Sequence, residues 1–257
     1  TGVRRTEAWE YEAAFTENTA GVFYGYGHDS QPPLPEVIER AHRHGLPVLV
    51  DAAGELPPKR NLSEIAALGA DLVGFSGGKA IRGPQSTGIL CGRRDLVASA
   101  AIQMLDMDDH LNLWDPPPEL VDREQLDGLP RHGIGRILKV SKEEVAALLA
   151  ALDLFVSDGY AEEARRAREQ LKGIIVALDD SPVRCELEES TAGGMPRLVI
   201  ALANRAEAFE ICQLLREGEP PVYVGHGRLA EGRLVIDLLC LDEEGVAVLA
   251  ARLREVL

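Results

Sequence analysis

Apolar and polar positions alternate along the first half of the chain in blocks that predict short strands and helices. Continuous apolar runs that end in glycine or a polar residue are typical of buried strands, whereas apolar residues repeated every three or four positions indicate helices. The pattern predicts strands at residues 20–27, 46–54, 71–76 and 86–92, and helices at residues 35–45, 61–70 and 94–105. Strands that alternate with helices predict an α/β fold with a mostly parallel sheet, covered on both faces.

The pattern changes in the middle of the chain. Residues 106–135 are acidic, rich in proline and glycine, and without a sustained period, so they predict a long irregular segment. Such a segment is either a functional loop or a disordered connector. Two long helices are predicted after it, at residues 141–159 and 160–180, and Ser141 with Glu144 fits a capping box at the start of the first.

The last part of the chain predicts a small α+β domain with an antiparallel sheet. Its pattern indicates strands at residues 183–189, 197–202, 221–227 and 233–238, and helices at residues 205–218 and 242–257. We therefore predict two domains, residues 1–140 and residues 141–257.

The composition predicts a soluble globular protein of the cytoplasm. Hydrophobic residues make up 46% of the chain, and the longest apolar runs are too short or too interrupted to span a bilayer. No basic and apolar leader follows Thr1, so we expect no signal peptide. The four cysteines are scattered and form no CxxC pair, which argues against a disulfide framework or a metal site.

The net charge argues against a nucleic-acid partner. The chain carries 42 acidic and 27 basic residues, for a formal net charge of −15. Proteins that bind nucleic acids usually present a basic stripe that neutralises phosphates, and the short basic clusters here are flanked by acidic residues.

Candidate chemistry lies at the ends of two predicted strands. Lys79 follows Gly77 and Gly78, and alone this trio is typical of an ordinary turn; the GxxxxGK[ST] phosphate loop is absent. However, Asp51 ends one predicted buried strand, where a charge is costly unless it is paired, and Ser76 ends another. Ligands of α/β sheets bind beyond such strand ends. Pyridoxal phosphate needs a lysine amine and a carboxylate partner, and the glycines would let the backbone approach it.

Three longer stretches carry a family resemblance. "VLVDAAGELPP", "GADLVGFSGGKAIRGPQSTGILCGRRDLV" and "HGIGRILKVSKEEVAALLAAL" resemble the selenocysteine-synthase-like family of fold-type-I pyridoxal-phosphate enzymes. That family includes L-seryl-tRNA(Sec) selenium transferase and D-glucosaminate-6-phosphate ammonia-lyase. The resemblance implies a fold-type-I large domain, of which residues 1–140 are the C-terminal portion, followed by a small C-terminal α+β domain.

The resemblance also implies roles for particular residues. Lys79 is expected to bind pyridoxal 5'-phosphate covalently and then to move the Cα proton of the substrate, and Asp51 to pair with the pyridinium nitrogen. Ala53 is expected to pack on the ring and Ser76 to contact the phosphate. Arg82 and Arg136 are candidate substrate clamps, because a guanidinium binds carboxylate or phosphate through two hydrogen bonds. Ordinary readings stay open: Asp51 as a helix N-cap or a satisfied buried acid, Ser76 as a turn residue, and both arginines as surface or interface ion pairs.

The sequence departs from the family pattern in two ways. The lysine turn reads SGGK followed by RGPQ, rather than SGDK followed by GGPQ, which is closer to the ammonia-lyase-like branch. The upstream part of the large domain, with its phosphate-binding loop, has no counterpart in this chain. Three explanations stay open: a fragment of a longer gene, a second chain that completes the site, or loss of cofactor binding.

The function predicted from these observations is that of a lyase-type enzyme dependent on pyridoxal phosphate. It would remove a Cα proton from an amino acid or amino-sugar acid and eliminate a β-substituent. The alternatives are a selenium transferase acting on seryl-tRNA and a non-catalytic or truncated subunit. The resemblance implies at least a homodimer.

Overall fold

The computed structural model describes residues 6–27, 29–189 and 194–257. The chain divides into two compact units, Thr1–Ser157 and Asp158–Leu257. Each unit has a hydrophobic core of its own, built from different strands and helices.

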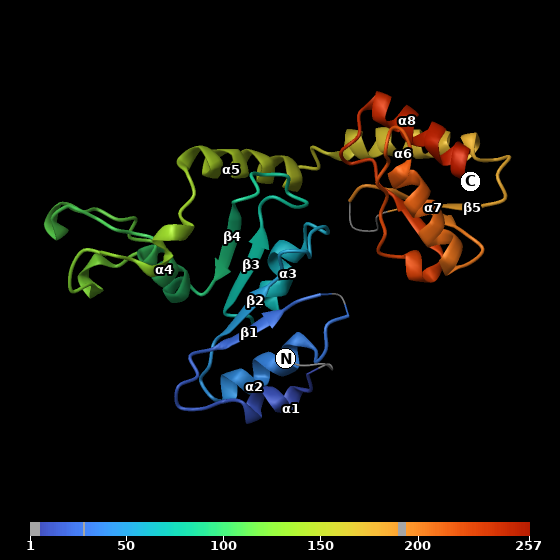
Figure 1. Ribbon diagram of the computed structural model, residues 1–257. Coiled ribbons are helices and arrows are strands. Elements are labelled where there is room, and N and C mark those ends of the chain that lie inside the picture. Colours follow the sequence, from blue (N-terminus) through green and yellow to red (C-terminus); the bar gives the residue numbers. More distant parts are fainter. Residues whose placement is uncertain (1–5, 28, 190–193) are drawn as a thin grey trace. The chain divides into compact units, whose positions relative to one another are not determined.

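The first unit is built on a four-stranded sheet of order β1-β2-β3-β4 (Figure 1). Its strands are β1 (Val22–Gly25), β2 (Val48–Asp51), β3 (Leu72–Ser76) and β4 (Gly88–Gly92). The first three are parallel and β4 is antiparallel to β3, which confirms the predicted mostly parallel α/β sheet. Helices α2 (Leu34–Arg43) and α3 (Asn61–Ala67) connect the parallel strands.

The two faces of this sheet differ. Alternate strand residues, among them Val48, Val50 and Phe75, are buried against α2 and α3. The residues between them point to the other face, where Phe23 is 64% exposed and Leu49 is 37% exposed. The prediction that both faces are covered is therefore wrong at β1 and β2 of this chain.

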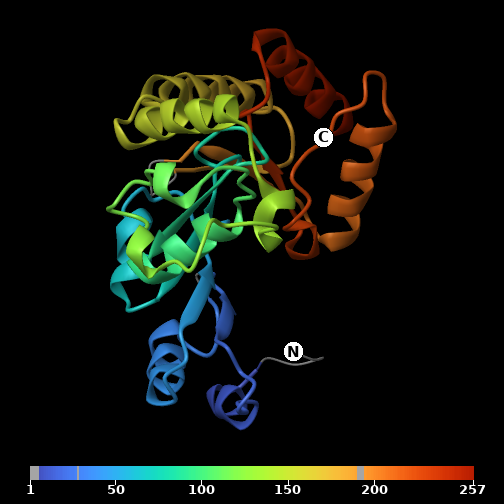
Figure 2. The ribbon, with the colours of Figure 1, turned by 90° about the vertical axis from the view of Figure 1, so that its left-hand side faces the viewer.

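The remaining elements of the first unit frame the sheet. The short helix α1 (Ala8–Ala13), which the sequence pattern did not predict, packs with α2 beside β1 (Figure 2). Helix α4 (Arg94–Gln103) follows β4. The predicted irregular segment is confirmed: between residues 106 and 141 the chain holds only the short 3-10 helices η1 (Leu111–Leu113), η2 (Arg123–Gln125) and η3 (Ile134–Leu138).

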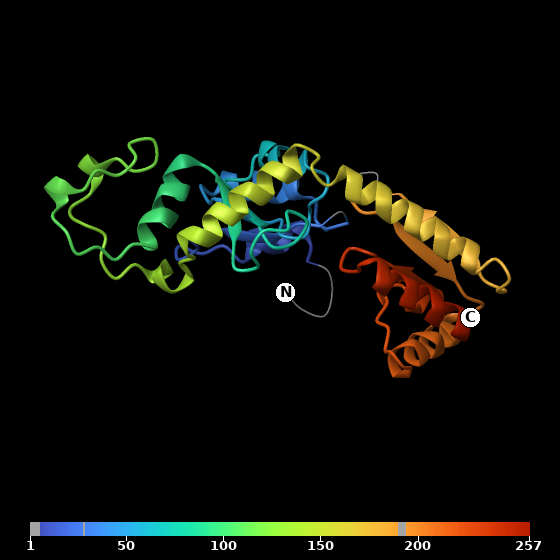
Figure 3. The same cartoon turned by 90° about the horizontal axis from the view of Figure 1, so that it is seen from above.

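Helix α5 (Lys142–Val156) belongs to the first unit (Figure 3). Its predicted capping box is confirmed, because Ser141 and Glu144 each accept the backbone N–H of the other. Leu148, Ala151 and Phe155 are buried. The compact units thus divide after Ser157, whereas the sequence placed the domain boundary at residue 140.

The second unit is an α+β fold with the antiparallel sheet β5-β6-β7. In chain order it comprises α6 (Ala161–Ala177), β5 (Arg184–Glu188), β6 (Arg197–Ala201), α7 (Arg205–Glu217), η4 (Leu229–Glu231), β7 (Arg233–Ile236) and α8 (Glu243–Val256). The strand predicted at residues 221–227 is wrong, since only Gly225 forms a bridge, to Val235. The N–H of Val222 instead donates to the carbonyl of Leu215, and Pro221 has no N–H to offer a sheet.

Within the described residues, no helix combines the length and the apolar character that a bilayer crossing requires. The same residues contain no group of three histidine, cysteine or acidic side chains placed to hold a metal ion.

Candidate active site

Asp51 lies on the open face of the sheet, between two glycines. The parallel registers place Asp51 opposite Gly25 on β1 and opposite Gly74 on β3. Leaving aside the adjacent residues, a Cβ atom added at Gly25 would have no atom within 4 Å. A Cβ atom added at Gly74 would have only the Val50 carbonyl oxygen nearby, at 3.9 Å. Asp51 is therefore exposed rather than buried, and open space lies on both sides of it.

The end of β2 holds Asp51 by backbone contacts. The Ala53 N–H donates to Asp51 Oδ1 at 3.0 Å, which orients the carboxylate. The Tyr26 N–H donates to the Asp51 carbonyl at 2.9 Å and extends the pairing with β1. Ala52 is fully buried between these residues, so the strand end is anchored while the carboxylate stays accessible.

Ser76 shares the open face with Asp51. Along β3, Leu72, Gly74 and Ser76 alternate with the buried Val73 and Phe75, so their side chains point to the face that carries Asp51. The structure thus brings Asp51 and Ser76 to one face at the carboxyl ends of neighbouring parallel strands. The expected role of Ser76 as a phosphate contact stays a prediction.

Lys79 lies on a tightly bonded loop directly after β3. The Arg82 N–H donates to the Lys79 carbonyl at 2.9 Å, and the Gly83 N–H donates to the Gly77 carbonyl at 2.8 Å. Ile81 is fully buried and anchors the loop, whereas Lys79 is exposed. The loop therefore presents an exposed lysine on a backbone held by hydrogen bonds.

The glycines of this loop allow it to pack closely against itself. A Cβ at Gly77 would lie 2.2 Å from Thr87 Oγ1, and one at Gly78 would lie 2.6 Å from the Cα of Gln85. Gln85 Nε2 also donates to the Gly78 carbonyl at 2.9 Å. The glycines therefore let the loop pack against itself, and their expected role of admitting a cofactor to the backbone stays a prediction.

The two predicted substrate arginines lie in different settings. Arg82 follows Lys79 on the same loop and has a φ of 64°, a left-handed conformation that is uncommon for residues other than glycine and clusters at functional sites. Arg136 lies on η3, and its Nε is 3.7 Å from Asp106 Oδ2. The His132 N–H bond to Asp106, with the charge of Arg136, lowers the pKa of that carboxyl. Sequence reasoning missed Asp106, which stands without a motif in an irregular segment.

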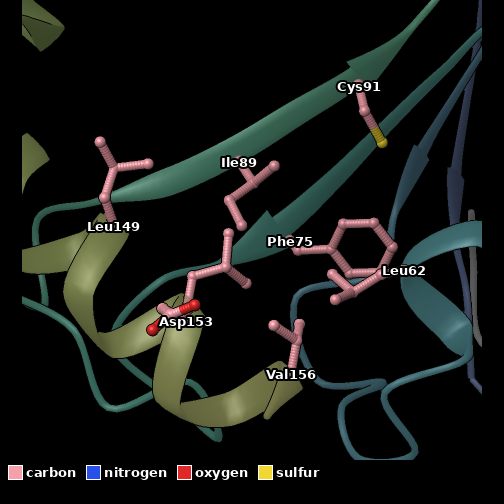
Figure 4. A pocket seen from close by; sticks show the side chains of 8 residues that line it. Leu62, Phe75, Ile89, Cys91, Leu149, Asp153 and Val156 are labelled. Atoms are coloured by element: carbon pink, nitrogen blue, oxygen red, sulfur yellow. The ribbon is translucent and has the colours of Figure 1, made fainter.

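An apolar cleft lies on the other face of the sheet. It has a volume of about 440 Å³ between α5 and strands β3 and β4, and Figure 4 shows its lining, including Phe75, Cys91, Leu149 and Asp153. Burial raises the pKa of the Cys91 thiol, so this cysteine is a poor nucleophile. Because Phe75 and Ser76 point to opposite faces, the cleft is separate from the Asp51 site.

The open-face site fits pyridoxal phosphate. A pyridinium ring needs an accessible carboxylate and a flat, unobstructed surface, and Asp51 between Gly25 and Gly74 offers both. The exposed Lys79, whose amine is the group that this cofactor needs for covalent attachment, follows β3, the strand that pairs with β2.

Comparisons with known proteins show what this chain is similar to. Residues 6–106 match the aminotransferase class-V family model. The chain is 29% identical to a 5'-C-glycyluridine monooxygenase-decarboxylase of a Streptomyces species over 99% of its length, covering 58% of that protein. It is 26% identical to the D-glucosaminate-6-phosphate ammonia lyase of Salmonella typhimurium, covering 96% of this chain and 60% of the relative. It is 27% identical to the L-seryl-tRNA(Sec) selenium transferase of Desulfovibrio desulfuricans, and the match covers 96% of this chain and 46% of the relative.

A solved structure shows the same fold. The structure of D-glucosaminate-6-phosphate ammonia-lyase superposes with a TM-score of 0.66 at 24% identity, covering the whole of this chain and 62% of the other. The chain thus spans about half to three-fifths of the length of the relatives that it matches. The resemblance predicted from the sequence is confirmed as a likeness: part of the chain matches the aminotransferase class-V model, the chain is similar in sequence to a D-glucosaminate-6-phosphate ammonia lyase and an L-seryl-tRNA(Sec) selenium transferase, and it shares the fold type I of the former.

Proposed function

We propose that this chain acts in a lyase-type enzyme dependent on pyridoxal phosphate. The reaction would remove a Cα proton from an amino acid or amino-sugar acid and expel a β-substituent. The observation that carries the proposal is the accessible Asp51 carboxylate between Gly25 and Gly74, on the same sheet face as Ser76 and one strand away from the Lys79 loop. The named chemistry of the ammonia lyase relative supports elimination.

The residues of the site have separable roles in this proposal. When bound, the cofactor supplies an electron sink for the pair left behind by the departing Cα proton. Lys79 Nζ would hold the cofactor covalently until the amino group of the substrate displaces it, and the freed Lys79 amine would then accept that proton. The Asp51 carboxylate accepts a hydrogen bond from the ring N–H and keeps this proton in place. Ser76 Oγ donates to the phosphate, and Ala53 packs beside the ring.

Arg82 and Arg136 are the proposed anchors for the acidic groups of the substrate. A guanidinium pairs with a carboxylate or phosphate through two parallel hydrogen bonds, which fixes orientation as well as charge. Asp106 now lies beside Arg136, so a substrate anion would have to replace Asp106 at that guanidinium. Substitution of Arg136 should then raise KM more than it lowers kcat.

A selenium transferase acting on seryl-tRNA is the second candidate, favoured by the transferase relatives. The net charge of −15 opposes it, because binding to tRNA rests largely on cationic side chains. We expect no retention of seryl-tRNA at physiological salt in a filter-binding assay. Binding that persists at high salt would favour the transferase over the lyase.

Cytoplasmic location and a homodimer complete the proposal. The scattered, unpaired cysteines support the cytoplasmic location, and the family resemblance supports the homodimer. Sedimentation equilibrium tests the assembly directly, and a monomer at micromolar concentration would contradict the homodimer.

Cofactor attachment provides the central test. The chain is mixed with pyridoxal phosphate and its visible absorption recorded, then treated with borohydride, digested and mapped. We expect an absorption band that borohydride bleaches and a label on Lys79. Lys79→Ala should abolish the label, while Lys59→Ala, an exposed lysine elsewhere in the unit, should leave it unchanged.

Asp51→Asn separates cofactor binding from catalysis. The variant keeps the size of the side chain but loses the charge that holds the ring proton, so labelling of Lys79 should persist while turnover falls by orders of magnitude. Absence of any band, even when the upstream segment of a relative is added in trans, would instead favour a non-catalytic subunit.

A further inference from the structure

Two arginines meet on the outer face of the sheet in the second unit. The antiparallel register places Arg184 of β5 opposite Ala201 of β6, and Ala201 opposite Arg233 of β7. Directly opposed residues point to the same face, with Cβ atoms about 5 Å apart, so the arginines stand roughly 10 Å apart across a small alanine. The helices cover the other face, where Leu198, Ile200 and Leu234 are buried.

Neither guanidinium has a carboxylate partner among the described residues. Other arginines of the same unit do: Arg168 pairs with Glu189, Arg197 with Asp237, and Arg228 with Glu188. Some described arginines of this unit, such as Arg166 and Arg254, also lack such a partner, but Arg184 and Arg233 lie on one sheet face, on either side of Ala201. Two like charges held side by side repel each other unless an anion lies between them.

A pocket lies between these arginines. It measures about 190 Å³ and is lined by Arg184, Glu186, Val199, Ala201 and Arg233. The usual sites for cofactors and drug-sized ligands measure roughly 300–1,000 Å³, so this pocket suits a small ion or the end group of a larger molecule. Glu186 is the one acidic side chain in this lining, and it reduces the positive charge without removing it.

We propose that Arg184 and Arg233 form a binding site for a phosphate dianion or the phosphate group of a small molecule. Each guanidinium can direct two N–H groups toward the anion, and Ala201 leaves space for it on the floor of the pocket. A dianion matches two cations better than a carboxylate does. The site lies entirely within the second unit and requires no pyridoxal phosphate, so it goes beyond the function proposed for Lys79.

Titration of the full chain with inorganic phosphate tests this site. The Nε–Hε NMR signals of the arginines are followed at constant ionic strength, with acetate as the comparison anion. We expect saturable shifts of Arg184 and Arg233, and acetate binding at least about tenfold weaker. Arg184→Gln and Arg233→Gln should each weaken phosphate binding about tenfold, the loss expected for one charged hydrogen-bonding partner.

Three further variants complete the test. Arg166→Gln, an exposed arginine on α6 outside the pocket, should leave the affinity unchanged. Glu186→Gln should tighten binding, because it removes the opposing charge. Lys79→Ala should bind phosphate like the unaltered chain, which separates this site from the cofactor site. Shifts that do not saturate, equal affinity for both anions, or undiminished binding in the Arg184 and Arg233 variants would overturn the proposal.

Discussion

At the scale of single residues, Asp71 is a buried carboxylate that several segments of the first unit contact. It lies just before β3 and accepts hydrogen bonds from the Val48 N–H and from His42 Nε2, both at 2.8 Å, and from Arg93 at 3.0 Å. Burial alone would raise the pKa of Asp71, but the bonds from His42, Val48 and Arg93 outweigh it and lower the pKa. Asp71 thus ties the starts of β2 and β3 to the end of α2 and the start of α4.

Asp71→Asn should destabilise the first unit by about 2–3 kcal/mol near neutral pH, since charged hydrogen bonds are lost at a buried site. The folded-state pKa lies below the unfolded value of 3.8. The stabilisation by Asp71 is therefore present above that value and is lost as the pH falls through the folded pKa. Urea unfolding at a series of pH values measures the difference between the two proteins.

Asp95→Asn is the matched control for this prediction. Asp95 also pairs with Arg93, at 2.6 Å, but at the surface, where ion pairs are screened by water. The free energy of unfolding of the Asp95→Asn variant should therefore differ little from that of the unaltered chain. An Asp71 variant that is no less stable than the Asp95 variant at neutral pH would refute the role assigned to Asp71.

At the scale of elements, α5 supports the lysine loop. A Cβ at Gly77 or Gly83 would lie 2.8 Å or 3.0 Å from Leu148 Cδ1, so the loop rests directly on this leucine. Ser86 Oγ also donates to Glu144, the residue that completes the capping box of α5. The backbone of the Lys79 loop is therefore positioned partly by a helix far along the sequence.

Leu148→Ala should cost about 2–4 kcal/mol of stability, because it leaves a cavity beneath the loop. It should also slow covalent labelling of Lys79 by pyridoxal phosphate and borohydride. Leu149→Ala, one residue on and 61% exposed, serves as the control and should change neither quantity appreciably. Chemical denaturation and labelling kinetics measure the two effects, and equal losses in both variants would contradict the supporting role of Leu148.

Most elements were predictable because local signals mark them. The capping box of α5 needs only Ser141 and Glu144, and strands β2 and β3 are continuous apolar runs between polar ends. The failures have a different cause. Residues 221–227 carry a strand-like pattern, but the backbone of Val222 bonds to Leu215, a choice made by packing rather than by local propensity.

At the scale of the whole molecule, the two separate cores predict two unfolding transitions. Gly173 lies in the interior of α6 with open space around it, so Gly173→Ala should stabilise the second unit by about 0.5–1 kcal/mol. In calorimetry this should raise one transition by roughly 2–8 °C and leave the other in place.

Gly232→Ala should have the opposite effect and lower the stability of the same unit. Gly232 has a φ of 72°, which alanine adopts only with strain, so the same transition should fall. A single transition that moves as a whole in both variants would show that the units unfold together.

The site residues were only partly predictable. Lys79, Asp51 and Ser76 stand at strand ends that the apolar pattern marks, and the register puts Asp51 and Ser76 on one face. The two glycines beside Asp51 could not be predicted from the sequence, because Gly25 and Gly74 lie far from Asp51 along the chain and become its neighbours only through strand pairing. The pairing of Asp106 with Arg136 could not be predicted either, because the two residues are also far apart along the chain.

The sequence by itself determined the alternation of strands and helices, the lysine turn and the chemistry available at it, because each depends on residues close together in the chain. Only the tertiary structure decided that Asp51 is exposed, that α5 supports the Lys79 loop, and that Arg184 and Arg233 share a pocket. Those facts depend on which strands pair and in what register. Pairing is selected by burial summed over the whole unit, and no short stretch of sequence carries that sum.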